Sequence, residues 1–491
     1  MTTKTAKKPA AKVASKADLD LCYLPAVEAL RLFRARKLSP VELMQTVIDR
    51  AEAIEPKINA FTFKYFDEAM ARARRAEAKY AKPGGRAGAL DGLPIAIKDE
   101  SYVTGYPTSN ASFILENNIA THTSPTNERI LKAGAIMFAR TATPEFSCAG
   151  FTHSRMWGVT RNPWNREFTP GGSSGGSAAS LAAGSTTLAT GSDIGGSIRI
   201  PASTCGLAGF KPPYGRNPDD PPFNLDHYNH TGPLARTVAD CILLQNVMAG
   251  PHPRDIATIR PKLTLPTTYE DIKGWRIAYS LDLGFFEVDK EVRRNTEKAL
   301  NVFRALGAEV EEVELSWTWD VYQAGIAHLS HLFGGFLSQF LDTHRDKLNP
   351  YVIEIGEFSR KSTVSDYLAG MVAEGKMYAE LGALLEQYKL LVCPTLAVPS
   401  IPADFDMTSQ KIHINGKEVH PWIGWAMTTV FNMMSRCPVL SLPSGRAKNG
   451  VPTGIQLVGR TFSDGDVFRA ASAYEAEIGP WFAKADMRPA L

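Results

Sequence analysis

Apolar residues recur at helical spacing in two stretches near the start of the chain. In LSPVELMQTVIDRAEAI, residues 38–54, Ser39 is placed as an N-cap, Pro40 stands at the first helical position and Glu42 completes a capping box. The second stretch is FDEAMARARRAEAKYA, residues 66–81. Both patterns place apolar residues on one face and polar residues on the other, so they predict surface helices packed on a core.

Short apolar runs bounded by turn residues come next. GLPIAIKD, residues 92–99, and GAIMFART, residues 134–141, predict strands, and SPTNERILKA, residues 124–133, predicts a helix between them. Strand, helix and strand at this spacing indicate a βαβ unit. A helical, aromatic-rich stretch covers residues 316–388, after which strand patterns return in LLVCPTLAVPS and VPTGIQLVGR.

These patterns predict an α/β fold: a single large domain whose central mixed, twisted β-sheet is covered by helices on both faces. The chain of 491 residues is long enough for a large core, and no convincing linker divides residues 19–491. Residues 1–18 are rich in Lys and Ala and cannot bury apolar surface, so we expect them to form a disordered tail.

Charge and cysteine usage exclude several classes of protein. The formal net charge is +3, but without the five lysines that precede Asp18 it becomes −2, so the folded body has no basic excess for a nucleic acid. The six cysteines form no C-x-x-C pair, which favours reduced thiols and a cytoplasmic location. We expect no membrane span, because no run of 18 apolar residues occurs.

The segment TPGGSSGGSAAS, residues 169–180, has the composition of a flexible linker. Its flanks argue against that interpretation, because the small residues that follow it imply close packing on all sides. It also contains a literal G-x-S-x-G, yet the residues before it are polar and end at Pro170, so no buried strand leads into the serine. A phosphate loop would need lysine where Ser177 stands.

The remaining interpretation joins PGGSSGGS, from Pro170, to GSDIGGSIRIP, from Gly191. Together they resemble the signature of the amidase signature family of serine hydrolases. Further segments resemble family blocks: DGLPIAIKDESYVTGYPTSNAS upstream, then GPLARTVADCILL, FNMMSRCPVLSLP and GVPTGIQLVGR. The resemblance covers roughly residue 18 to the C-terminal end. Residues 255–425 hold few such blocks, and we expect them to select the substrate.

The resemblance implies a catalytic triad of Ser197 as nucleophile, Ser173 as bridge and Lys98 as base, with a cis peptide bond before Ser173. In the implied relay, neutral Lys98 draws a proton through Ser173 from Ser197, and the proton returns to the leaving amine. A lysine base needs a lowered pKa, which burial at the end of an apolar strand supplies.

Consecutive amides around the nucleophile can serve as an oxyanion hole, which we assign to Ile194, Gly195 and Gly196 together with Ser197. Ser174, Asp193 and Arg199 are expected to support these loops by hydrogen bonds. Three positions depart from the usual family pattern, namely Glu100, Arg140 and Ala142, and we expect none of them to touch the triad.

The implied function is hydrolysis of a carboxamide, or of a related carbamate or ester, in a small and apolar or aromatic substrate. Ser147, Cys148 and Trp425 are candidate pocket residues, although the tryptophans are equally compatible with plain core. We expect no cofactor and no metal. The pairs His227/His230 and His328/His331 lack a third ligand in sequence and are interpreted as polar residues of a loop and a helix.

Two other functions stay open. The main rival is the A subunit of a glutamine-dependent amidotransferase, which would need partner subunits, although Glu100, Arg140 and Ala142 weaken an assignment to that subfamily. The other is a catalytically inactive member that only binds a ligand. A homodimer is also compatible with the sequence.

Overall fold

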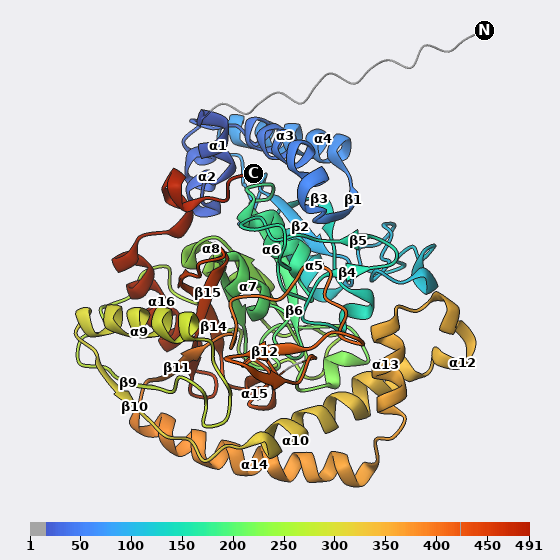
Figure 1. The fold of residues 1–491 in the computed structure, drawn as a ribbon. Coiled ribbons are helices and arrows are strands. Elements are labelled where there is room, and N and C mark those ends of the chain that lie inside the picture. Colours follow the sequence, from blue (N-terminus) through green and yellow to red (C-terminus); the bar gives the residue numbers. More distant parts are fainter. Residues whose placement is uncertain (1–15, 423) are drawn as a thin grey trace.

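The structure is a computed structural model and describes residues 16–422 and 424–491. The expected N-terminal tail falls largely outside this range, and helix α1 (Lys16–Cys22) begins two residues before the expected end of that tail. The described residues form a single α/β domain built around one large mixed sheet, which is the fold class that the sequence predicts (Figure 1).

The sheet has eleven strands within the described residues, in the spatial order β1-β3-β2-β6-β8-β7-β14-β15-β11-β9-β10. The strands are β1 (Phe61–Lys64), β2 (Pro94–Lys98), β3 (Ile136–Thr141), β6 (Leu188–Asp193), β7 (Ala208–Lys211), β8 (His230–Ala235), β9 (Arg276–Tyr279), β10 (Glu309–Glu312), β11 (Leu390–Pro394), β14 (Val439–Arg446) and β15 (Pro452–Gly459).

The predicted βαβ unit is present. Strands β2 and β3 pair in parallel, and α5 (Pro125–Lys132) lies between them in the chain. Strand β6 pairs in parallel with the other side of β2, whereas β8 is antiparallel to β6. The C-terminal ends of β2 and β6 therefore lie next to each other, and this edge carries Lys98 and Asp193.

Helices cover both faces of the sheet, as predicted. They include α2 (Ala26–Arg34), α3 (Pro40–Ile58), α4 (Phe66–Ala81), α6 (Gly175–Ala182), α7 (Arg199–Cys205), α8 (Val238–Met248), α9 (Lys290–Ala305) and α16 (Asp464–Ile478). Alternate residues of β15 show the two layers. Ile455 and Leu457 pack with α9 and α16, whereas Gln456, on the other face, accepts a hydrogen bond from Arg199 of α7.

Helix α3 begins as predicted, with one difference in its cap. The Ser39 hydroxyl accepts a hydrogen bond from the Val41 amide at 2.9 Å, and Pro40 is the first helical residue. The Ser39 hydroxyl also donates to Glu77 of α4. No capping box with Glu42 is formed among the described residues, because the Ser39 hydroxyl accepts from the amide of Val41 and not from that of Glu42, as a capping box requires.

The aromatic-rich stretch folds into helices at one edge of the molecule. Helices α10 (Trp319–Leu329) and α14 (Val364–Gln387) lie side by side there, opposite the end at which α1 to α4 gather (Figure 1). Helix α13 (Pro350–Ser359) connects this layer to the rest. None of the described helices combines the length and the apolar character that crossing a bilayer requires.

Candidate active site

Lys98 is the last residue of β2, and its side chain is fully buried. The strand is apolar and both of its faces are covered, so the ammonium is shielded from water. Its Nζ donates hydrogen bonds of 2.7 Å to both Ser173 Oγ and Ser192 Oγ, and it lies 2.9 Å from Glu100 Oε2. Burial lowers the pKa of Lys98 below its ordinary value, and the negative charge of Glu100 opposes that shift.

Ser173 lies just before α6, and the peptide bond between Gly172 and Ser173 is cis, as the resemblance implies. Neighbouring backbone atoms leave no room for a Cβ at two glycines near Ser173. A Cβ at Gly172 would lie 2.2 Å from the Phe151 carbonyl oxygen, and one at Gly176 would lie 2.4 Å from the Ala142 amide nitrogen. Every residue of α6 is buried. The segment that resembles a linker is therefore a packed part of the core.

Ser197 follows β6 and lies two residues before α7. Its carbonyl accepts a hydrogen bond of 3.2 Å from the Ser174 amide, which ties the two serine loops together through their backbones. Within the described residues the Ser197 hydroxyl forms no hydrogen bond, so the link between Ser173 and Ser197 is not closed. Such bonds are often long without substrate and tighten when it binds.

A buried ion pair holds the loop that carries Ser197. Arg199 donates to both carboxylate oxygens of Asp193, at 2.9 and 2.8 Å, and also reaches Gln456 and Asn432. The amide of Asn432 donates to Asp193 in turn, at 2.8 Å. Burial alone would raise the pKa of Asp193, but the charge and hydrogen bonds of Arg199 hold it below its ordinary value. This network fixes the turn between β6 and α7.

The backbone amides between Asp193 and Arg199 differ in whether they already donate a hydrogen bond within the protein. The Gly196 amide donates to Asp193 Oδ1 at 2.8 Å, so it is already occupied, contrary to its expected place in the oxyanion hole. The amides of Ile194, Gly195 and Ser197 have no acceptor among the described residues. The Gly195 carbonyl is fixed by the hydroxyls of Thr428 and Thr429, at 2.7 and 3.0 Å. Three amides therefore remain free to face a carbonyl oxygen.

Ser174 supports the same loops more weakly. Its hydroxyl donates to the Ser192 carbonyl at 3.4 Å and accepts from the Ser192 amide at 3.3 Å. This contact joins the start of α6 to the end of β6. Asp193, Arg199 and Ser174 thus form hydrogen bonds within the loops that carry the two serines.

The expectation that no departure touches the triad is wrong for Glu100. Its carboxylate contacts Lys98 directly and also accepts a hydrogen bond of 2.5 Å from Ser147 Oγ. The charge of Lys98 and these bonds outweigh the opposing effect of burial and lower the pKa of Glu100. Arg140 contacts Lys98 only through the backbone, donating to its carbonyl at 3.1 Å. Residue spacing could not show these contacts, because Glu100 lies beyond the end of the strand.

Ser192 is a second hydrogen-bond partner of Lys98 that was not among the predicted site residues. Thr190 Oγ1 accepts from the Lys98 amide at 3.1 Å, and Ser192 lies two residues further along the same strand. Residues two apart share a face of a strand. The parallel pairing of β2 with β6, combined with this period of two, was the signal that could have indicated Ser192.

Two cavities meet at these residues. The one beside Ser173 has a volume of about 250 Å³, and the one beside Ser197 has a volume of about 50 Å³. Ser147, Ile194 and Phe333 line both, so the two cavities are adjacent. Cys148 lines the smaller one.

Trp425 does not line either cavity, which corrects its place among the candidate pocket residues. Its side chain is 1% exposed and packs behind Gly150, where a Cβ would lie 3.0 Å from the indole ring. Its Nε1 donates to the Pro421 carbonyl at 3.1 Å. Trp422 lines the smaller cavity instead.

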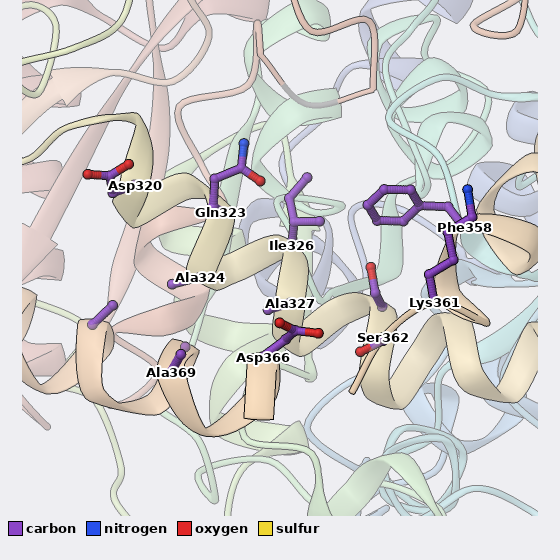
Figure 2. Close-up of a pocket in the computed structure, with 13 residues that line it drawn as sticks. Asp320, Gln323, Ala324, Ile326, Ala327, Phe358, Lys361, Ser362, Asp366 and Ala369 are labelled. Atoms are coloured by element: carbon purple, nitrogen blue, oxygen red, sulfur yellow. The ribbon is translucent and has the colours of Figure 1, made fainter. Parts of the chain in front are cut away.

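A separate cavity of about 370 Å³ lies between α10 and α14, away from this chemistry. Figure 2 shows its lining, which includes Asp320, Gln323, Phe358, Lys361 and Asp366. It contains none of the residues expected to act on a substrate. Its size alone gives it no catalytic role.

The histidines gather in a combination that the sequence spacing did not suggest. Asp226, His227 and His328 present ligand atoms within 4.8 Å of one another. His328 Nε2 lies 2.7 Å from Asp226 Oδ1, its ring stacks on Tyr228, and His227 Nε2 lies 3.3 Å from Glu374 Oε2. These contacts join a loop to α10 and α14, so we interpret the residues as a polar cluster that links packed elements.

Known proteins match this chain over nearly its whole length. A family model described as Amidase matches residues 42–468. The chain is 33% identical to an acylamidase of Rhodococcus erythropolis over 483 residues, which is 96% of this chain and 98% of that protein. It is also 32% identical over 477 residues to the A subunit of a glutamyl-tRNA(Gln) amidotransferase from Cyanothece, covering 91% of this chain and 96% of that protein.

Comparison with solved structures finds the same family. A bacterial aryl acylamidase of the amidase signature family superimposes with a TM-score of 0.87 at 30% identity, covering 95% of this chain and 98% of that one. Fold, site and matches together define a hydrolase of amide bonds. The chain belongs to the amidase family, the amidase signature enzymes.

Proposed function

We propose that the protein hydrolyses small carboxamides with an apolar or aromatic acyl group through an acyl-enzyme on Ser197. The observation that carries the proposal is the 2.7 Å hydrogen bond between Lys98 Nζ and Ser173 Oγ inside a buried site. Burial favours the neutral lysine, which is the form that can accept a proton.

The proposed reaction proceeds in two steps. Lys98 accepts a proton from Ser173 as Ser173 accepts one from Ser197, and Ser197 Oγ forms a bond to the substrate carbonyl carbon. The oxyanion is held by the free amides of Ile194, Gly195 and Ser197. The proton returns through Ser173 to the amine as its bond to the carbonyl carbon breaks. Water then attacks the Ser197 ester by the same proton path and releases the acid.

The acyl group belongs in the small cavity beside Ser197. That cavity is lined mainly by apolar and small side chains, among them Ile200, Leu329, Ile355 and Trp422. Leu329, Phe333, Ile355 and Trp422 come from residues 255–425, which supports that region as a selector of substrate. The test is a hydrolysis panel of p-nitroanilides, carbamates and esters with varied acyl chains, run with wild type and Ser197→Ala. Hydrolysis by the alanine variant near the wild-type rate would refute the proposal.

The A subunit of an amidotransferase is the second candidate, supported by relatives of that description at about a third identity. The two functions differ in what the isolated chain does. An amidase cleaves aryl amides unaided, whereas an A subunit hydrolyses glutamine to supply ammonia to partner subunits. An inactive, ligand-binding member would fail to react with a fluorophosphonate at Ser197.

Location and assembly are proposed on separate observations. All six cysteines are free and buried, which fits the reducing cytoplasm. Exposed apolar side chains occur on α14 at Val364, Leu368, Met371 and Val372. This face would be the contact of a homodimer. Sedimentation velocity of wild type against Leu368→Glu tests the dimer, and a monomeric wild type would refute it.

A further inference from the structure

The larger cavity differs in charge from the smaller one. The cavity beside Ser173 is lined by three carboxylates, Glu100, Asp219 and Asp220, and no lysine or arginine is among its lining residues. The cavity beside Ser197 is lined by no charged residue. The two sides of the reacting centre therefore offer a substrate opposite environments.

Two of the carboxylates lack a permanent cationic partner. Glu100 is paired with Lys98. Asp219 accepts hydrogen bonds of 2.8 Å from the Asp220 amide and from Asn229 Nδ2. Asp220 accepts one of 2.5 Å from Ser124 Oγ and lies 3.4 Å from His122 Nε2. Neither aspartate forms an ion pair with a lysine or arginine anywhere in the described chain.

Aromatic rings complete the wall of this cavity. They are contributed by Tyr102, Phe146, Phe223, Phe333 and Phe336. Phe223 packs edge-on against both Phe333 and Phe336, with ring centroids 5.5 Å apart in each pair. Aromatic faces together with carboxylates are the surroundings that favour an organic ammonium group.

The proton path indicates which part of the substrate enters this cavity. Ser173, which lines it, is the residue that passes the proton to the leaving amine in the proposed function, on which this inference rests. The amine must therefore leave on the Ser173 side, while the acyl group stays on Ser197. The cavity volume of about 250 Å³ accommodates an aryl or alkyl amine with a further substituent.

We propose that the cavity lined by Asp219, Asp220 and Glu100 binds the leaving-amine part of the substrate and selects amines that carry a second, positively charged nitrogen. The cation lies among the aromatic rings and opposite Asp219 and Asp220. The preferred substrates are thus monoacylated diamines and aryl amides with a distal ammonium group.

The charges around Asp219 support this selection. Burial, together with the negative charges of Asp220 and Glu100, raises the pKa of Asp219 to about 7. A cation in the cavity offsets that repulsion and favours the ionised carboxylate. The negative charge of Glu100 raises the pKa of Lys98, and a nearby cation offsets that effect. A cationic substrate therefore promotes the neutral lysine that the reaction needs.

The test uses two butyryl anilides of the same shape. One carries a para trimethylammoniomethyl group and the other a para neopentyl group, so that they differ in charge but not in bulk. The ratio of their kcat/KM values is measured for wild type, Asp219→Asn and Asp220→Asn. Glu116→Gln is the matched control, because Glu116 is an exposed acid beside Leu115 that does not line the cavity.

Wild type should favour the cationic anilide, and each aspartate variant should reduce the ratio about tenfold while the Glu116 variant keeps it. Comparing ratios between variants cancels the intrinsic reactivity of the two anilides. A ratio that is the same in wild type and in both aspartate variants would overturn the inference.

A binding measurement separates this inference from the proposed function. Calorimetry compares the affinity of wild type for the two product amines and its dependence on salt. If neither anilide is cleaved but the cationic amine binds selectively, the proposed function fails while the selectivity of the cavity for a cationic amine is retained. If the cationic amine binds no better than the neutral one, the inference fails whatever the activity. This measurement also decides the matter if the aspartate variants do not fold.

Discussion

Lys98 Nζ lies 2.9 Å from a carboxylate oxygen of Glu100, a residue only two positions further along the chain. Both side chains are largely shielded from solvent, and the lysine also donates to Ser173. The contact stabilises the protonated lysine, whereas a base must be neutral. In the proposed reaction, Glu100 therefore opposes the effect of burial on the pH at which Lys98 becomes neutral.

Replacing Glu100 should move the pH profile of the enzyme. In Glu100→Gln the negative charge is gone, burial acts on Lys98 unopposed and its pKa falls further. The neutral fraction at a given pH then rises, so the acid limb of kcat/KM against pH should shift to lower pH. A Glu116→Gln variant should leave the limb in place. An unmoved or upward-shifted limb in Glu100→Gln would contradict the assigned role.

Lys98 and Lys211 provide a matched pair of buried lysines. Lys98→Ala should lose about 10³-fold or more in kcat/KM with the fold retained, because a general base contributes a large factor in rate. Lys211 Nζ donates to the carbonyls of Ser435 and Cys437 instead, at 3.3 and 2.9 Å. Lys211→Met should lower the melting temperature yet keep the activity of the folded fraction. Equal loss of activity in both variants would mean that Lys98 is structural.

Gly172→Ala should prevent correct assembly of the site. The added methyl group would lie 2.2 Å from the carbonyl oxygen of Phe151, which is backbone and cannot move aside cheaply. Gly375→Ala in α14 is the control, because nothing lies within 4 Å of its added Cβ. That variant should be more stable by about 0.5 to 1 kcal/mol, from helix propensity. Soluble expression, thermal unfolding and fluorophosphonate labelling measure both, and full labelling of Gly172→Ala would contradict the prediction.

Glu55 should make stability depend on pH. Burial raises its pKa from 4.5 to about 7, against the hydrogen bonds it accepts from the Phe61 and Ala60 amides. The native state therefore holds this proton more tightly than the unfolded chain. The contribution is complete below pH 4.5 and is lost as pH rises through about 7.

The loss amounts to about 3 kcal/mol and should be absent in Glu55→Gln, which cannot ionise. Urea unfolding at pH 5 and pH 8 measures it as the difference between variant and wild type. Glu52→Gln, at an exposed position of the same helix, should show no such change with pH. A difference for Glu55→Gln that is constant from pH 5 to pH 8 would contradict the prediction.

Local patterns predicted much of the fold. The strands at Pro94–Lys98 and Ile136–Thr141 and the helix at Phe66–Ala81 lie where periodicity placed them. The mixed sheet with helices on both faces was likewise confirmed. These features depend on short stretches of chain, so the sequence carries them directly. The capping box predicted at Ser39 is absent because its hydroxyl caps the Val41 amide, one position before Glu42, and this one-residue difference in the cap is not visible in the motif.

The site was predictable where a motif carried it and not where tertiary packing decided. Lys98 and Ser173 lie together as the resemblance implied, although 75 positions separate them in sequence. The contact of Glu100 with Lys98 and the burial of Trp425 depend on how loops turn after the strands end. The occupied amide of Gly196 depends on the orientation of one peptide group, which four consecutive amides in a sequence do not reveal.

The parallel pairing of β2 with β6 has a consequence for measurement. Ile95 lies opposite Leu188 and Ala96 opposite Ala189, and this register brings Lys98 to Ser192 and Ser173. A slip of one residue would turn Lys98 to the opposite face of the sheet and leave the helices and the overall shape nearly unchanged. If Ser197 is the nucleophile, as proposed, its covalent labelling would count only the molecules whose strands are correctly paired, and it would report sheet register in a refolding experiment.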